Sequence, residues 1–134
     1  MPEQTVPHKL FQVGQKAFIT RDGEVLVVFF HNGWLDFPGG RIDEGETDII
    51  EALKREVREE TSLEVDVGEP FATWLGRGGT VYLVGYRCRY VSGQVTLSDE
   101  HSSFRWLNRG NFTEVDDDSA PFEALRRYFQ TSET

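Results

Sequence analysis

The sequence predicts an α/β or α+β sandwich, in which a sheet packs against helices. Three observations lead to this fold class. Apolar runs at strand length recur along most of the chain, one helical pattern over 47–61 interrupts them, and a second over 121–129 closes the chain. The order does not repeat as βαβα, so a doubly wound parallel sheet is not favoured.

The predicted strands are apolar runs bounded by glycine, proline and acidic residues. Arg21-Asp22-Gly23-Glu24 is a hairpin turn signal, and Gly76-Arg77-Gly78-Gly79 is a glycine turn. Strands are expected at 11–20, 25–30, 64–67, 70–75, 80–91 and 103–107, with 94–98 as a hairpin partner of 80–91. Between them, 35–42 leads through Phe37-Pro38-Gly39-Gly40 into a turn.

Both helices carry start signals. Thr47 or a neighbouring residue is expected to cap the first helix. The run Asp116-Asp117-Asp118-Ser119 is expected to cap the second, with Pro121 in its first turn.

Length and composition indicate one domain, residues 1–134, with flexible ends at 1–9 and 130–134. The chain is 38% hydrophobic, which is enough to bury a core. Its formal net charge of −9 would repel nucleic-acid phosphates, so non-specific binding to DNA or RNA is not expected. A phosphorylated ligand would need metal ions or local basic groups to approach.

The chain is expected to be cytoplasmic. Cys88 is the only cysteine, so no intramolecular disulfide can form, which fits a reducing compartment. The N-terminus lacks a signal-peptide pattern, and no apolar run reaches the ~20 residues that a membrane span needs.

The first helix carries glutamates where a helix disfavours them. Projected at about 100° per residue, Glu60 falls inside the apolar face, and Glu56 and Glu59 lie along its edge. That face consists of Ile49, Ile50, Leu53 and Val57. The helix dipole penalises negative charge in the last turn by about 0.3–1 kcal/mol per group.

Two interpretations of these glutamates stay open. They could belong to a solvated surface, where Arg55 pairs with Glu59 four residues later. Alternatively, a divalent cation could offset the cost of the cluster. Oxygen ligands without histidine or cysteine suit Mg²⁺ or Mn²⁺ better than zinc.

The stretch GGRIDEGETDIIEALKREVREETSL resembles the Nudix box, the signature of the Nudix hydrolases. The residues that match the box are Gly40, Glu46, Arg55, Glu56, Val57, Glu59, Glu60 and Leu63. The approach from Trp34 to Gly40 and the stretch from Asp99 to Leu107 also resemble family members. The resemblance implies an α/β/α sandwich with a mixed sheet, a central catalytic helix and a C-terminal helix.

The chain departs from the box at two places. Eight residues, rather than seven, separate Glu46 from Arg55, which puts the role of Glu46 in question. Ser62 replaces a glycine that would normally take a left-handed backbone conformation at the helix end. A serine in that conformation costs about 1 kcal/mol.

The resemblance implies a hydrolase that cleaves the diphosphate linkage of a nucleoside di- or triphosphate or a related derivative. Mg²⁺, or Mn²⁺, would be held by Glu56, Glu59, Glu60 and the carbonyl of Gly39. Arg55 would orient a neighbouring carboxylate, and Gly40 and Glu46 would be structural. The general base would be a box glutamate or Glu100, whereas His101 is expected to be a polar loop residue.

The substrate is defined less sharply. Trp34 and Phe37 could stack on a base, although Phe37 could instead be core. Arg77 could reach a phosphate, or be an ordinary surface arginine. The partner would be a small-molecule nucleotide, and a homodimer is compatible with the family. A nucleotide sugar or dinucleoside polyphosphate is an alternative substrate, and a non-catalytic nucleotide-sensing module is an alternative of another class.

Overall fold

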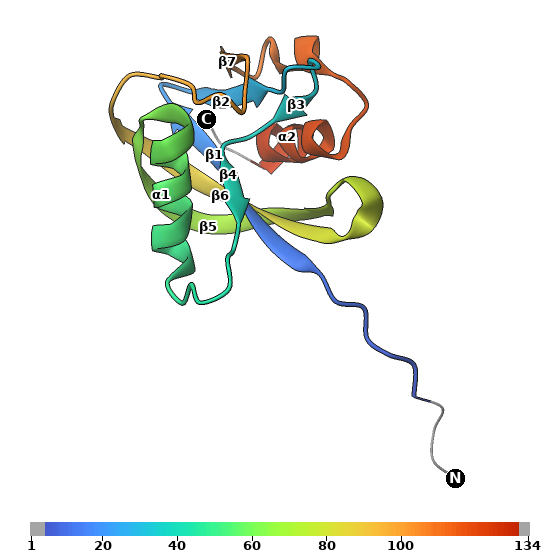
Figure 1. The fold of residues 1–134 in the computed structure, drawn as a ribbon. Coiled ribbons are helices and arrows are strands. Elements are labelled where there is room, and N and C mark those ends of the chain that lie inside the picture. The colour runs from blue at the N-terminus through green and yellow to red at the C-terminus, as the bar shows by residue number, and fades with distance from the viewer. Residues whose placement is uncertain (1–4, 132–134) are drawn as a thin grey trace.

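The computed structural model describes residues 5–131, apart from the side chain of Arg77 (Figure 1). The strands are β1 (Gln12–Arg21), β2 (Glu24–Phe29), β3 (Leu35–Asp36), β4 (Gly39–Arg41), β5 (Glu64–Leu75), β6 (Val81–Ser92) and β7 (Ser103–Leu107). The helices are α1 (Ile49–Thr61) and α2 (Ala120–Thr131), with short 3₁₀ turns at η1 (Arg77–Gly79) and η2 (Phe112–Val115).

The strands form one mixed sheet in the order β3-β2-β1-β6-β5. Strands β1 and β6 run parallel, and the other pairs are antiparallel. Strand β1 pairs with β4 near its start and with β2 near its end, while β7 pairs with β2. The change of partner along β1 brings the Pro38-Gly39-Gly40 turn to the middle of the sheet, where Ala17 N–H donates to the Pro38 carbonyl at 2.8 Å.

Alternate residues of β1 supply the two cores. Ala17 and Ile19 pack with α1 residues, whereas Phe18 packs with α2 residues. Because successive side chains of a strand point to opposite faces, the two helices cover opposite faces of the sheet. In Figure 1, α1 and α2 accordingly lie apart, with β1 between them. The predicted α/β/α sandwich with a mixed sheet is confirmed.

Several predicted boundaries are wrong, each for a local reason. Segments 64–67 and 70–75 form one strand, β5, with irregularities on either side of Pro70 that let the strand continue. Residues 94–98 form no strand. Instead, the N–H groups of Thr96 and Ser98 donate to the carbonyls of Thr61 and Glu60, at 2.9 and 3.1 Å. The end of α1 thus gains partners for carbonyls that no helical N–H reaches.

Helix α1 begins at Ile49 rather than at residue 47, whereas its cap lies next to Thr47, as expected. Asp48 caps α1 by accepting the N–H of Glu51 at 3.1 Å. Ile49 starts the helix and is exposed rather than part of the buried face. Of the ends expected to be flexible, residues 130 and 131 belong to α2, and residues 5–9 are exposed without regular structure. Residues 1–4 and 132–134 lie outside the described part.

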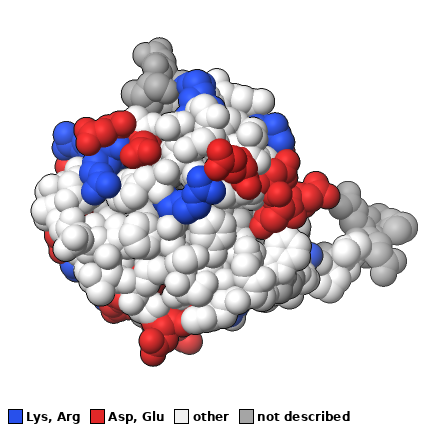
Figure 2. Space-filling view, turned by 90° about the horizontal axis from the view of Figure 1, so that it is seen from above, with Lys and Arg blue, Asp and Glu red and all other residues white. Residues whose placement is uncertain are grey.

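The surface carries both signs of charge. On the face in Figure 2, acidic and basic side chains lie interspersed among uncharged residues. Within residues 5–131, neither helix has the length and apolar character that crossing a bilayer would require.

Candidate active site

Glu60, in the last turn of α1, is buried beside the glycine turn. Its side chain points inward, as the helical projection predicts, and the residue is only 5% exposed. Oε2 of Glu60 accepts the backbone N–H of Gly39 at 2.8 Å. This contact joins the entry of the box to its last glutamate.

The two box glycines are required by close approach. Gly39 has φ +149°, and a Cβ there would lie 1.9 Å from the carbonyl oxygen of Gln15. A Cβ on Gly40 would lie 2.7 Å from the carboxylate of Glu56. Any larger residue would therefore move either the sheet or the carboxylate.

Arg55 links three box carboxylates. Its guanidinium lies 3.3 Å from Glu46, 3.0 Å from Glu56 and 3.5 Å from Glu59. Glu46 also accepts the N–H of Asp43 at 2.7 Å. Glu46 lies in the loop before the cap residue Asp48, and it still reaches Arg55 despite the additional residue of the box.

The carboxylates of α1 lie in contrasting environments. The side chain of Glu59 is 60% exposed, whereas that of Glu56 is mostly buried. Burial and the charge of Glu59 raise the pKa of Glu56, and Arg55 opposes the shift. Glu56 therefore ionises less readily than an exposed glutamate does.

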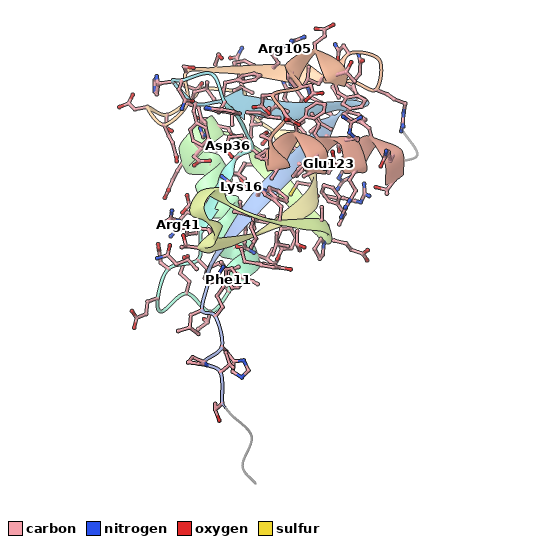
Figure 3. All side chains as sticks on the ribbon, turned by 90° about the vertical axis from the view of Figure 1, so that its right-hand side faces the viewer. Phe11, Lys16, Asp36, Arg41, Arg105 and Glu123 are labelled. Atoms are coloured by element: carbon pink, nitrogen blue, oxygen red, sulfur yellow. The ribbon has the colours of Figure 1, made fainter. Side chains whose placement is uncertain are left out.

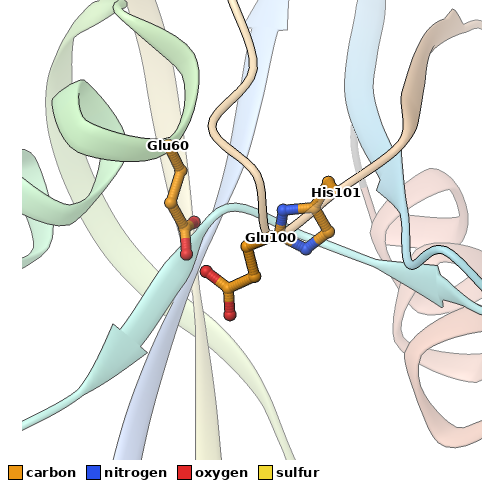
Figure 4. Close-up of side chains that lie close together, drawn as sticks. All are labelled: Glu60, Glu100 and His101. Atoms are coloured by element: carbon orange, nitrogen blue, oxygen red, sulfur yellow. The ribbon is translucent and has the colours of Figure 1, made fainter.

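Glu100, in the loop between β6 and β7, lies opposite Glu60. One ligand atom each from Glu60, Glu100 and His101 lies within 4.8 Å of the others (Figure 4). Burial and a hydrogen bond with Glu100 raise the pKa of Glu60 to about 9, although the Gly39 N–H favours the anion. The structure brings together α1 and the late loop, which the sequence related only through the family resemblance.

Behind these carboxylates lies a buried ionic chain. The ammonium of Lys16 on β1 is 3.1 Å from Asp36 on β3, whose other oxygen is 2.8 Å from Nε2 of His101. Figure 3 labels Lys16 and Asp36 near the middle of the molecule. Burial works against ionisation of Asp36, but Lys16 and the hydrogen bond from His101 prevail and lower its pKa.

A cleft of about 1290 Å³ opens beside these groups. Its lining includes Glu56, Glu60, Glu100, Lys16, Trp34, Trp74 and Ser119. Trp34 is 41% exposed and lines the cleft. A cleft of this size can hold a nucleotide-sized ligand.

Of the residues predicted to contact substrate, Phe37 and Arg77 are not placed in the cleft by the described structure. Phe37 is fully buried and stacks on Phe18 at 3.9 Å between ring centroids, so the interpretation of Phe37 as a base-stacking residue is wrong. Only the core alternative fits. Arg77 starts η1, and its side chain is not described.

Sequence reasoning missed Lys16, Asp36 and the buried position of His101. The available signals were weak. Asp36 interrupts an apolar run between Leu35 and Phe37, and His101 directly follows the candidate base. Neither spacing reveals that β1, β3 and the late loop meet, because these contacts span 20 and 65 residues.

Comparisons with known proteins identify the family of this chain. The family model described as NUDIX domain matches residues 10–128. A MutT-like protein from Streptomyces ambofaciens is 27% identical over 115 residues, covering 84% of this chain and 74% of the relative.

Many solved structures share the fold. The MutT protein from Methanosarcina mazei Go1 has a TM-score of 0.74 and 23% identity, covering 93% of this chain and 96% of that one. An ADP-ribose pyrophosphatase from Streptococcus suis 89-1591 has a TM-score of 0.68 and 21% identity, covering 92% of each chain. The chain therefore belongs to the NUDIX domain family.

Proposed function

We propose that this protein is a Mg²⁺-dependent hydrolase of nucleoside di- or triphosphates or related nucleoside diphosphate derivatives. The observation that carries the proposal is the buried Glu60 carboxyl facing Glu100 at the edge of a nucleotide-sized cleft. Two carboxylates held this close destabilise each other when ionised. A bound divalent cation would remove that cost.

The donor types suit such a cation, and among the described residues the carboxylates that converge are those of Glu60 and Glu100, beside His101. Glu56, Glu59, Glu60 and the carbonyl of Gly39 offer only oxygen atoms, which Mg²⁺ and Mn²⁺ prefer. When bound, the cation would neutralise phosphate charge and lower the pKa of a coordinated water. Arg55, which contacts Glu56 and Glu59, would hold those carboxylates in place.

The remaining residues would position water and substrate. Glu100 would take the proton of the attacking water as its oxygen bonds to phosphorus. The anhydride P–O bond would break, and the bridging oxygen would leave with the other phosphate. Trp34 would contact the base across the cleft, and Gly39 and Gly40 would let phosphate approach the backbone.

The substrate is best sought among nucleoside triphosphates and ADP-ribose. One structural neighbour is described as a MutT protein and another as an ADP-ribose pyrophosphatase. Nucleotide sugars and dinucleoside polyphosphates belong in the same assay. The partner would be the small nucleotide itself, with a cytoplasmic location and no nucleic-acid or membrane partner.

The test is a substrate panel with Mg²⁺ and with Mn²⁺, in which nucleotide, phosphate and pyrophosphate products are identified. Cation-dependent release of two phosphorylated products, or of one with orthophosphate, supports the proposal. No turnover of any diphosphate contradicts it. Thermal stabilisation by a nucleotide without any hydrolysis would instead identify a nucleotide sensor.

A further inference from the structure

The loop from Gly93 to Ser102 is anchored on both sides of Glu100. Toward α1, Ser98 N–H donates to the backbone carbonyl of Glu60 at 3.1 Å. Toward the sheet, His101 bonds to Asp36 of β3 at 2.8 Å, and Ser102 N–H donates to the carbonyl of Phe29 in β2 at 2.9 Å. The loop thus bridges the helix end and the sheet, with Glu100 between the anchors.

Glu100 itself has few contacts besides the hydrogen bond between its carboxyl group and that of Glu60. The residue is exposed, and its N–H lies 3.4 Å from the hydroxyl of Ser98. An exposed glutamate on a loop samples many rotamers unless its backbone is fixed. The position of its carboxylate opposite Glu60 therefore depends on the neighbouring anchors.

His101 is the most deeply buried of these anchors. Its side chain is 1% exposed, and its ring lies 5.2 Å from that of Phe30. Asp36 is held as an anion by Lys16, so Nε2 of His101 donates to it. The carboxylate therefore fixes both the hydrogen on Nε2 and the plane of the ring, as carboxylates do behind other functional histidines.

The other ring nitrogen points to a role beyond packing. Among the described atoms, Nδ1 is buried and has no hydrogen-bond partner. One imidazole nitrogen lies within 4.8 Å of carboxylate oxygens of both Glu60 and Glu100. A buried nitrogen without a partner beside two carboxylates is uncommon for a histidine that only fills the core.

We propose that His101 is a positioning residue that acts through Glu100. Lys16 and Asp36 fix the imidazole, and the imidazole fixes the adjacent Glu100 so that its carboxylate faces Glu60. This inference rests on the proposed function, in which Glu100 is the general base. Displacing a catalytic group by about 1 Å can cost about 100-fold in rate, so the anchor would matter kinetically.

Two amide substitutions form a matched pair. His101→Gln places an amide N–H near the position of Nε2 and retains donation to Asp36. His101→Asn is one methylene shorter and loses it. We expect His101→Asn to lower kcat by about 10–100-fold while KM changes less than about threefold. We expect His101→Gln to retain most of the wild-type kcat. Melting temperatures of both variants report whether the fold is intact.

A double-mutant cycle tests whether His101 acts through Glu100. Mn²⁺ affinity, measured by electron paramagnetic resonance, is compared among the wild type, His101→Asn, Glu100→Gln and the double variant. Displacing or neutralising a carboxylate beside the cation weakens its binding, so this readout does not require turnover. We expect both single variants to bind Mn²⁺ more weakly and the double variant to be no weaker than Glu100→Gln.

The outcomes separate the two proposals. The positioning role of His101 is overturned if the losses of Mn²⁺ affinity in the two single variants add in the double variant. It is also overturned if His101→Gln and His101→Asn have equal effects. If His101→Asn does not fold, the same cycle with His101→Gln decides. In that cycle, fully additive losses of Mn²⁺ affinity would overturn the positioning role. So would a His101→Gln protein whose Mn²⁺ affinity and turnover are as low as those of Glu100→Gln. A wild type that binds Mn²⁺ but hydrolyses no diphosphate refutes the proposed function, while the cycle still decides the role of His101.

Discussion

The backbone N–H of Gly39 donates to the carboxylate of Glu60 at 2.8 Å across 21 residues of chain. This bond connects the turn after β3 with the last turn of α1. Glu60 thereby becomes a buried carboxyl with one fixed oxygen and Glu100 opposite it. The charge cluster that the helix dipole disfavours is thus built into the fold.

Alanine substitutions at the two box glycines should have different effects. Gly39→Ala drives a Cβ into the backbone of β1 and should destabilise the protein by more than about 3 kcal/mol. Gly40→Ala meets only the end of the Glu56 side chain. It should leave the melting temperature within a few degrees of the wild type and lower turnover. Urea denaturation and kinetics measure both, and equal stabilities of the two variants would contradict the geometry.

The cation-free protein should lose stability as pH rises. The unfolded pKa of Glu60 is near 4.5 and the folded pKa is about 9, so the folded state binds the proton more tightly. The contribution of Glu60 to the free energy of unfolding is therefore most favourable below pH 4.5 and is lost progressively as the pH rises to 9. In chelator, Glu60→Gln should be more stable than the wild type at pH 8, by about 1–3 kcal/mol, and the difference should shrink toward pH 5.

Urea denaturation at pH 5 and pH 8 measures that difference. Added Mg²⁺ should stabilise the wild type more at pH 8 than at pH 5, and should stabilise Glu60→Gln less at both. The opposite order in chelator at pH 8, with Glu60→Gln less stable than the wild type, would show that buried Glu60 does not destabilise the cation-free protein.

Replacing Ser62 should stabilise the protein. Ser62 has φ +67° and ψ +13°, the left-handed conformation expected of the missing box glycine. Ser62→Gly should raise the free energy of unfolding by about 0.5–1 kcal/mol. Ser62→Ala is the control, because it removes the hydroxyl but keeps the backbone strain. Equal stabilities of the glycine and alanine variants would mean that the strain is negligible.

The ion pair between Asp36 and Lys16 should stabilise the fold at neutral pH. Asp36→Asn leaves the ammonium of Lys16 without its buried counter-ion and should cost about 3–5 kcal/mol. The folded pKa of Asp36 is lowered below its ordinary value of 3.8, so this stabilisation is present above pH 3.8 and lost as pH falls through the folded pKa. Denaturation of both proteins from pH 3 to pH 7 should show the difference narrowing at the acid end. A difference independent of pH would exclude Asp36 as the titrating group.

Local patterns were enough to predict most elements. The period of α1 predicts the inward position of Glu60, and the turn signals predict the β1–β2 hairpin. The prediction of a strand over 94–98 fails because its N–H groups bond to the end of α1, which no local pattern reveals. Phe37 fails as a ligand contact because aromatic residues beside a motif look the same whether buried or exposed.

The candidate site was predictable only in part. Box residues on one helix keep their spacing when the helix folds, so Arg55 reaches its carboxylates as expected. The Lys16–Asp36–His101 chain was not predictable, because it depends on sheet order and on where a loop crosses. Long-range contacts of this kind follow from packing of the whole chain rather than from the sequence period.

The most direct test of the central claim is the Mg²⁺-dependent turnover of Glu59→Gln on the substrate that the panel identifies. Glu59 is largely exposed, so its loss should leave the fold intact. Glu51→Gln, on the same helix and also exposed, is the matched control. The account predicts a fall in kcat of about 100-fold or more for Glu59→Gln and less than about twofold for Glu51→Gln. Near-normal turnover of Glu59→Gln would contradict the assignment of the α1 glutamates to a catalytic cation.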